Sequence, residues 1–135
     1  MDWTELDRRL AELEARLRSD PAALARERTR LLKETALAAH RESAGKVKTV
    51  PSVPVPSPSW LGVWYTPGVS AVSLAIRDNP EASFELTGRG NRVAIVTDST
   101  RVLGDGDCGP AGGMGVMEGK ALLMSLLAGI DAWPV

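Results

Sequence analysis

The sequence predicts an α/β fold, in which a small parallel-type sheet is flanked by helices and preceded by a helical hairpin arm. Residues 2–44 are rich in charge and lack glycine, four prolines interrupt the next segment, and strand-like and helix-like segments alternate from Trp60 onward. Strands that alternate with helices are typical of α/β proteins. We therefore divide the chain into a helical arm at 1–44, a proline-rich extended connector at 45–59 and an α/β domain at 60–135.

Composition excludes several classes of protein. The chain has 135 residues, of which 44% are hydrophobic and 24% charged, and its formal net charge is -1. It has no run of like charges that would serve nucleic-acid or membrane-surface binding, no signal-peptide pattern and no apolar stretch long enough to span a membrane. Its single cysteine, Cys108, has no partner for an internal disulfide. We expect a cytoplasmic protein with no nucleic-acid partner and no membrane association.

The helical arm carries one apolar stripe. Four leucines recur at spacings of four, three and four residues, with Trp3 one turn earlier, which is the pattern of an amphipathic helix. The leucines are Leu6, Leu10, Leu13 and Leu17. Because an isolated short helix is marginal in water, something must cover this stripe. A second helix folded back as a hairpin, or a second copy in a homodimer, would provide the cover.

A stop and a restart separate the two helices of the arm. Asp20 is a candidate N-cap, and Pro21 follows at the first helical position, where the missing N–H has no cost. The second helix should extend from about Pro21 to His40. The prolines at 51, 54, 56 and 58 then exclude a helix or a central strand, so this connector should be extended.

The last part of the chain alternates between helix and strand. We expect helices at Gly68–Arg77 and Met117–Ala128, with a short β-branched strand at Arg92–Thr97 between them. Asn79 and Pro80 stop the first helix, and the glycines from Gly104 to Gly119 provide the turn before the last.

The loop Gly104-Asp-Gly-Asp-Cys-Gly109 satisfies the G-x-G-x-x-G pattern of dinucleotide-binding folds. Such a fingerprint opens directly into a helix and is followed by an acidic residue about 20 positions later on another strand. Here further glycines and a proline follow, and Asp105 would place negative charge beside a pyrophosphate. The pattern alone does not predict a nucleotide site.

A series of short motifs, taken in order, is more specific than any one of them. The motifs are Tyr65-Thr-Pro-Gly-Val69, Leu86-Thr-Gly-Arg89-Gly-Asn91, Val96-Thr-Asp98, Leu103-Gly104, Met117-Glu-Gly-Lys120 and Gly129-Ile-Asp-Ala-Trp-Pro-Val135. Their order resembles the N-terminal domain of malic enzymes. The resemblance covers about residues 45–135 and leaves the arm outside it.

The resemblance implies oxidative decarboxylation of malate to pyruvate with NAD or NADP and a divalent cation, Mg or Mn. Lys120 matches the family's lysine, which accepts the proton of the C2 hydroxyl as a neutral amine. Tyr65 matches the tyrosine that protonates the enolate carbon after carbon dioxide leaves. Arg101 stands where larger members place an arginine whose planar fork grips a malate carboxylate. Without the motifs, all three would be interpreted as ordinary surface or packing residues.

The chain departs from the family pattern at two loop positions and in its extent. Ser99 replaces the usual glycine after Thr-Asp, and Asp105 replaces an aliphatic residue between two glycines. Asp98 and Asp107 are interpreted as loop residues that bond to backbone. The family's metal carboxylates and nicotinamide-binding domain follow the last motif, so we expect no cofactor-binding or metal residues within this chain.

Four hypotheses follow. The chain is half of a split malic enzyme with a separate NAD(P)-binding subunit, an inactive truncated homologue, a module that binds malate or a similar dicarboxylate, or a dimerisation or docking element. Malic enzymes are dimers or larger, so the resemblance implies a homodimer.

Overall fold

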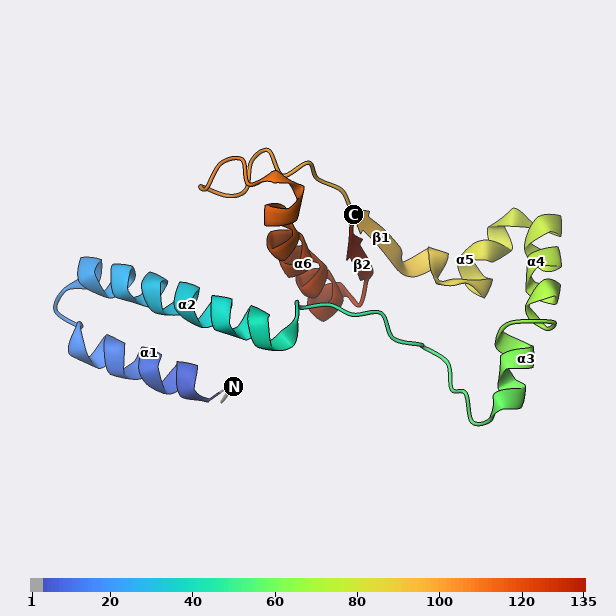
Figure 1. The fold of residues 1–135 in the computed structure, drawn as a ribbon, viewed down its shortest axis with the longest axis horizontal. Helices are drawn as coiled ribbons and strands as arrows, with labels where there is room; N and C mark the ends of the chain where they lie inside the picture. Colours follow the sequence, from blue (N-terminus) through green and yellow to red (C-terminus); the bar gives the residue numbers. More distant parts are fainter. Residues whose placement is uncertain (1–3) are drawn as a thin grey trace. The chain divides into compact units, whose positions relative to one another are not determined.

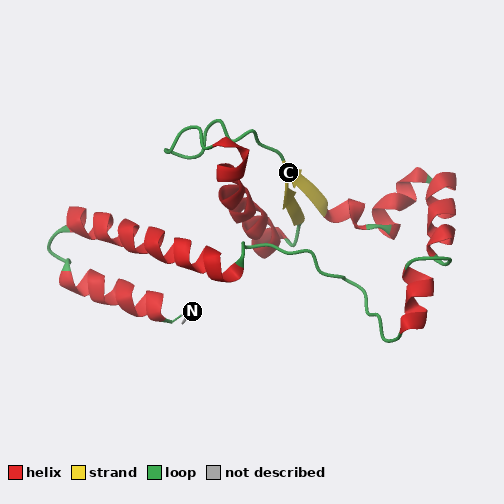
Figure 2. Cartoon of the chain, in the orientation of Figure 1, coloured by secondary structure: helices red, strands yellow, loops and turns green. Residues whose placement is uncertain are grey.

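A computed structural model describes residues 4–135, and the chain divides into two compact units, Met1–Lys46 and Val47–Val135 (Figures 1 and 2). Trp3 lies outside the described residues. The elements are α1 (Glu5–Arg16), α2 (Pro21–Ser43), η1 (Pro58–Trp60), α3 (Leu61–Trp64), α4 (Val69–Asp78), η2 (Pro80–Ala82), α5 (Ser83–Leu86), η3 (Gly88–Asn91), β1 (Arg92–Ile95), α6 (Gly109–Ala128) and β2 (Asp131–Pro134).

The first unit is a helical hairpin, in which α2 covers the leucine stripe of α1. Leu13 of α1 and Leu31 of α2 are the buried residues of these helices, and the stripe's other leucines are half-buried. An ion pair of 3.8 Å between Arg28 and Glu14 also joins the two helices. The hairpin alternative for covering the stripe is therefore the one that the structure shows.

The turn between α1 and α2 follows the predicted chemistry. The Asp20 side chain accepts a hydrogen bond of 2.9 Å from the Ala23 amide, and Pro21 occupies the first turn of α2. The helix extends to Ser43, three residues beyond the predicted end at His40, because no breaker occurs before Ala44. Ala44 then takes a left-handed φ of 53°, which ends the helix.

The second unit begins with an extended segment that leads to a group of short helices. The indole Nε1 of Trp64 donates to the carbonyl of Pro54 at 3.0 Å, which attaches the proline-rich segment to α3. The rings of Trp60 and Trp64 stack with centroids 5.9 Å apart. Helix α4 follows at Val69–Asp78, within one residue of the predicted bounds.

The remainder of the second unit is the predicted α/β element. Strands β1 and β2 pair in parallel, with Arg92 opposite Asp131 and Ile95 opposite Pro134. Helix α6 connects them and packs on both strands (Figure 1). The predicted α/β class with a small parallel sheet is confirmed, although β1 ends at Ile95 and not at Thr97.

The prediction that the glycines from Gly104 to Gly119 form a turn is wrong over its second half. Helix α6 begins at Gly109, so five glycines of the cluster are helical. Glycine costs about 1 kcal/mol relative to alanine in a helix, which is why the pattern indicated a turn. The helix forms nevertheless, and its Ala121 is 1% exposed in the core. Packing against the sheet thus outweighs local propensity.

Candidate functional site

Tyr65 begins the tight turn that joins α3 to α4. Its amide donates to the Leu61 carbonyl at 2.9 Å, and its own carbonyl accepts from the Val69 amide at 2.8 Å. A Cβ on Gly68 would lie 2.6 Å from the Gly62 carbonyl oxygen, so this turn requires glycine. The motif therefore has a structural reason in this chain. The Tyr65 side chain itself is 72% exposed.

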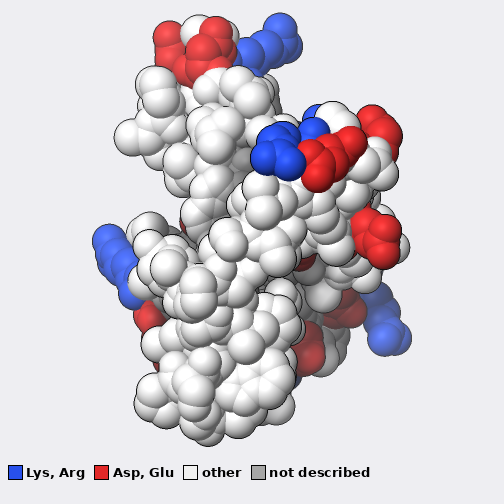
Figure 3. Space-filling view, turned by 90° about the vertical axis from the view of Figure 1, so that its right-hand side faces the viewer, with Lys and Arg blue, Asp and Glu red and all other residues white. Residues whose placement is uncertain are grey.

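The surroundings of Tyr65 are uncharged. Residues 49–76 contain no charged side chain, and Figure 3 shows a predominantly uncharged face. Several large apolar side chains of α3 and α4 are exposed. They include Leu61, Val63, Trp64, Val69 and Leu74. An anionic substrate at Tyr65 would therefore need a counter-charge from elsewhere.

Lys120 lies within α6 and its side chain is exposed. The next residue, Ala121, is buried, and α6 packs on β1 and β2. The sheet thus holds the backbone at Lys120, while the long lysine side chain remains free to reach a ligand.

Arg101 lies in the loop between β1 and α6, with its side chain exposed. Val102 beside it is 6% exposed and anchors the loop, since its amide donates to the Gly106 carbonyl at 2.8 Å. Asp98 accepts bonds of 3.1 and 2.9 Å from the amide and hydroxyl of Thr100. Both hydrogen bonds lower the pKa of the Asp98 carboxyl, and the one from the Thr100 backbone amide has the larger effect.

The glycine loop before α6 does not fit a nucleotide phosphate. The Asp107 carboxylate accepts a hydrogen bond of 2.9 Å from the Gly109 amide, at the first residue of the helix. A carboxylate therefore already occupies part of the position where a phosphate would bind at a helix N-terminus. Asp98 and Asp107 bond to backbone, as predicted. Residues 4–135 also hold no group of three or more histidine, cysteine or acidic side chains suited to a metal ion.

The motif Leu86-Thr-Gly-Arg89-Gly-Asn91 has a structural role that the sequence analysis did not identify. The Arg89 guanidinium donates to the Ser83 hydroxyl at 2.8 Å and lies 4.5 Å from the centre of the Phe84 ring. Asn91 donates to the Gly129 carbonyl at 2.8 Å. Gly129 caps α6, so the motif connects α5 and η3 to the C-terminal end of the helix that carries Lys120.

The three candidate residues do not form one site in this structure. Figure 1 shows α3, after which Tyr65 lies, well separated from α6 within the second unit. Arg101 belongs to the loop that leads into α6 and is therefore nearer in sequence to Lys120. Tyr65 and Lys120 would need a further rearrangement, or another chain, to act on one small substrate.

Comparisons with known proteins agree with the motif analysis. Residues 44–135 match the family model "Malic enzyme, N-terminal domain". The NAD-dependent malic enzyme of Geobacillus stearothermophilus is 47% identical over 91 residues, which are 67% of this chain and 19% of that enzyme. The bifunctional malic/malolactic enzyme of Bacillus subtilis is 40% identical over 104 residues, 77% of this chain and 25% of that protein.

Solved structures show the same similarity. The malic enzyme of Entamoeba histolytica is 50% identical, with a TM-score of 0.79 over 83% of this chain and 23% of that one. The NAD-dependent malic enzyme of Thermotoga maritima is 44% identical, with a TM-score of 0.70 over 74% of this chain and 28% of that one. The chain thus spans about a quarter or less of the length of the Geobacillus stearothermophilus and Bacillus subtilis enzymes. No helix among the described residues is long and apolar enough to cross a membrane.

Proposed function

The chain belongs to the malic enzyme family, and we propose that it supplies the malate side of that family's reaction, the oxidative decarboxylation of malate to pyruvate. One observation carries the proposal: the matched residues 44–135 contain both Tyr65 and Lys120, and both side chains are exposed and able to meet a substrate. A cytoplasmic location is part of this proposal.

Each of the three residues has one role in the proposed reaction. The Lys120 amine accepts the proton of the malate C2 hydroxyl as the alcohol becomes a ketone. The Tyr65 hydroxyl donates a proton to the enolate carbon after carbon dioxide leaves. The Arg101 guanidinium forms a bidentate contact with a malate carboxylate and supplies the positive charge that the uncharged surroundings of Tyr65 lack.

The proposed reaction needs groups that the described residues do not hold. NAD(P) and Mg or Mn would supply the hydride acceptor and the Lewis acid, and we assign both to a separate domain or subunit. The separation of α3 from α6 supports this assignment, because a partner is also needed to bring Tyr65 and Lys120 together. The domain division at 1–44, 45–59 and 60–135, and a homodimer, belong to the same proposal.

Titration calorimetry with malate and oxaloacetate tests the substrate half of the proposal. We expect saturable binding, with or without manganese, that Lys120→Ala and Arg101→Ala each weaken at least about tenfold, or about 1.4 kcal/mol. Lys48→Ala is the control, because it removes an exposed lysine of the second unit outside the matched motifs. Absence of binding to folded protein, or equal weakening in the control, would refute the residue assignment.

A second candidate function is a non-catalytic module for dimerisation or dicarboxylate binding. The observation that favours it is the exposure of apolar side chains on the second unit, such as Val96 at 76%, Leu126 at 72% and Leu127 at 81%. Faces of this kind are commonly covered by another protein surface. Sedimentation of the wild type and of Leu126→Asp tests this function: a dimer that the substitution dissociates supports it, and a monomeric wild type contradicts it.

A further inference from the structure

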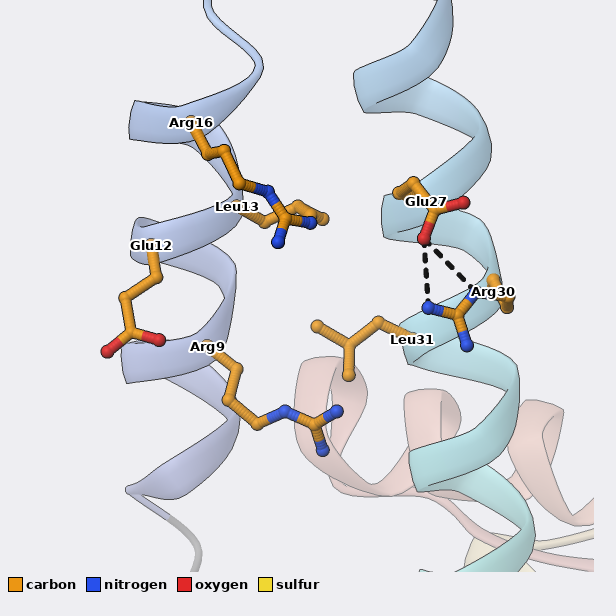
Figure 4. Close-up of a pocket in the computed structure, with 7 residues that line it drawn as sticks. All are labelled: Arg9, Glu12, Leu13, Arg16, Glu27, Arg30 and Leu31. Atoms are coloured by element: carbon orange, nitrogen blue, oxygen red, sulfur yellow. Dashed lines mark hydrogen bonds and ion pairs between the residues drawn. The ribbon is translucent and has the colours of Figure 1, made fainter.

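The helical hairpin has a cleft of its own, between α1 and α2 of the first unit. Its volume is about 410 Å³, and its residues come from both helices (Figure 4). Leu13 and Leu31, 8% and 6% exposed, form its apolar floor, and Arg9, Arg16 and Arg30 surround them. The cleft lies outside the segment 44–135 that matches the malic enzyme domain, so the proposed reaction does not account for it.

Most charges at the cleft are already compensated. Glu12 pairs with Arg8, and Glu27 pairs with Arg30 at 2.9 Å. Arg30 also reaches Glu34 at 2.7 Å, so neither of the two glutamates nor this arginine offers an unpaired charge.

The two remaining arginines of the cleft, Arg9 and Arg16, are not paired in this way. No hydrogen bond or ion pair with another of the described residues holds Arg9 or Arg16. Figure 4 shows both side chains extending from α1 toward α2, with Leu13 between them along the helix. The cleft therefore presents two uncompensated guanidinium groups beside an apolar floor.

The spacing of these guanidinium groups limits what they can hold. Arg9 and Arg16 are seven residues apart on one helical face, about 10.5 Å along the axis, and flexible side chains can converge on a ligand between them. A guanidinium offers a planar fork of donors that matches carboxylate and phosphate oxygens. The cleft volume also falls in the range of small-molecule sites.

We propose that the cleft between α1 and α2 binds a small oxyanion with two or more negative charges, held by Arg9 and Arg16 over Leu13. The shared chemistry includes phosphates and short dicarboxylates. This site is formed by residues of the first unit alone and does not depend on the proposed malate chemistry.

Titration calorimetry of the full chain at constant ionic strength tests this site, with inorganic phosphate, pyrophosphate and succinate as probes. We expect saturable binding of at least one probe, weakened at least tenfold by Arg9→Gln and by Arg16→Gln. Glutamine retains good helix propensity, so both variants should keep the wild-type circular dichroism spectrum. The probe that binds most tightly identifies whether the ligand is of the phosphate or the carboxylate class.

Arg26→Gln is the matched control, since Arg26 is an exposed arginine of α2 that does not line the cleft. Arg26→Gln changes the net charge by the same amount as the two test variants. Because Arg26 does not line the cleft, the affinity should nevertheless stay within about twofold of the wild type. Equal weakening in this control would show attraction by net charge and overturn the proposal, as would absence of saturable binding. Succinate binding that Lys120→Ala abolishes and Arg9→Gln spares would also overturn it.

Discussion

Ser99 and Gly113 make a contact whose energetics can be tested by exchanging two side chains. Ser99 is 2% exposed, has a left-handed φ of 59°, and its hydroxyl has no hydrogen-bond partner among the described residues. A Cβ on Gly113 would lie 1.8 Å from the Ser99 Oγ and 2.7 Å from its Cβ. Either residue is thus expected to respond to a change in the other.

Ser99→Gly should stabilise the second unit. A left-handed conformation costs a residue other than glycine about 1–2 kcal/mol, and a buried unsatisfied hydroxyl costs about 1–3 kcal/mol. Glycine loses about 0.5–1 kcal/mol more in chain entropy on folding. The first two terms favour the variant and the third opposes it, so we expect a net gain of about 2 kcal/mol in the free energy of unfolding.

The effect of Gly113→Ala on stability should have opposite signs in the wild type and in the Ser99→Gly variant. In the wild type the new methyl group meets the Ser99 side chain, so overpacking of about 1–3 kcal/mol exceeds the helix-propensity gain of about 1 kcal/mol. With Ser99→Gly the two nearest atoms are absent, and the next neighbour, the Cα of residue 99, is 3.7 Å away. The same substitution should then stabilise the unit by about 1 kcal/mol.

Urea unfolding followed by tryptophan fluorescence measures the four proteins of this cycle. The control is Ser125→Gly, at an exposed position of α6, which should destabilise because glycine weakens a helix. A Gly113→Ala effect of equal size in both backgrounds would refute the contact. A destabilising Ser99→Gly would refute the assignment of strain and lost hydrogen bonding to Ser99.

Three further predictions concern other parts of the chain. Leu13→Ala should destabilise the hairpin by about 2 kcal/mol, seen as earlier loss of helical signal on heating, whereas exposed Leu37→Ala should change little. The hydrogen bonds that lower the pKa of Asp98 stabilise the fold at pH values above the pKa of about 3.9 in the unfolded state. This stabilisation is lost as the pH falls through the pKa of the folded state. The stability difference between wild type and Asp98→Asn should therefore shrink below about pH 4; a constant difference would contradict it. Asn91→Ala should lower unfolding stability by about 1 kcal/mol, and no change would show that its bond to Gly129 is unimportant.

Local rules predicted the arm well because its elements are decided by nearby residues. The leucine spacing, Asp20 and Pro21 together define two helices, and no distant contact overrides them. The start of α6 could not be predicted in this way. The loop at Ser99 packs against Gly113 in its glycine-rich first half, and the helix as a whole packs on the sheet, and neither contact is visible in a local pattern.

The sequence indicated which residues to examine for function, but not how they lie. The motifs selected Tyr65, Lys120 and Arg101, and spacing alone could not predict that the first lies apart from the second. The role of Arg89 and Asn91 was also missed, because their partners Ser83 and Gly129 become neighbours only on folding. The unpaired Arg9 and Arg16 carry no motif, and only the hairpin shows that they share a cleft.

The stability of the second unit and the proposed reaction both require a partner that covers exposed faces of this unit. Parallel sheets are normally covered on both faces, and a sheet of two strands has little stability of its own. Here Val93 and Trp133 of the two strands are 40% and 48% exposed, and Tyr65 lies on an uncharged face elsewhere on the unit. A chain or domain that covers these faces would stabilise the unit and could also bring Tyr65 toward Lys120. Partner binding that stabilises the unit should therefore accompany activity, and stabilisation by a partner without any gain in malate affinity would separate the two requirements.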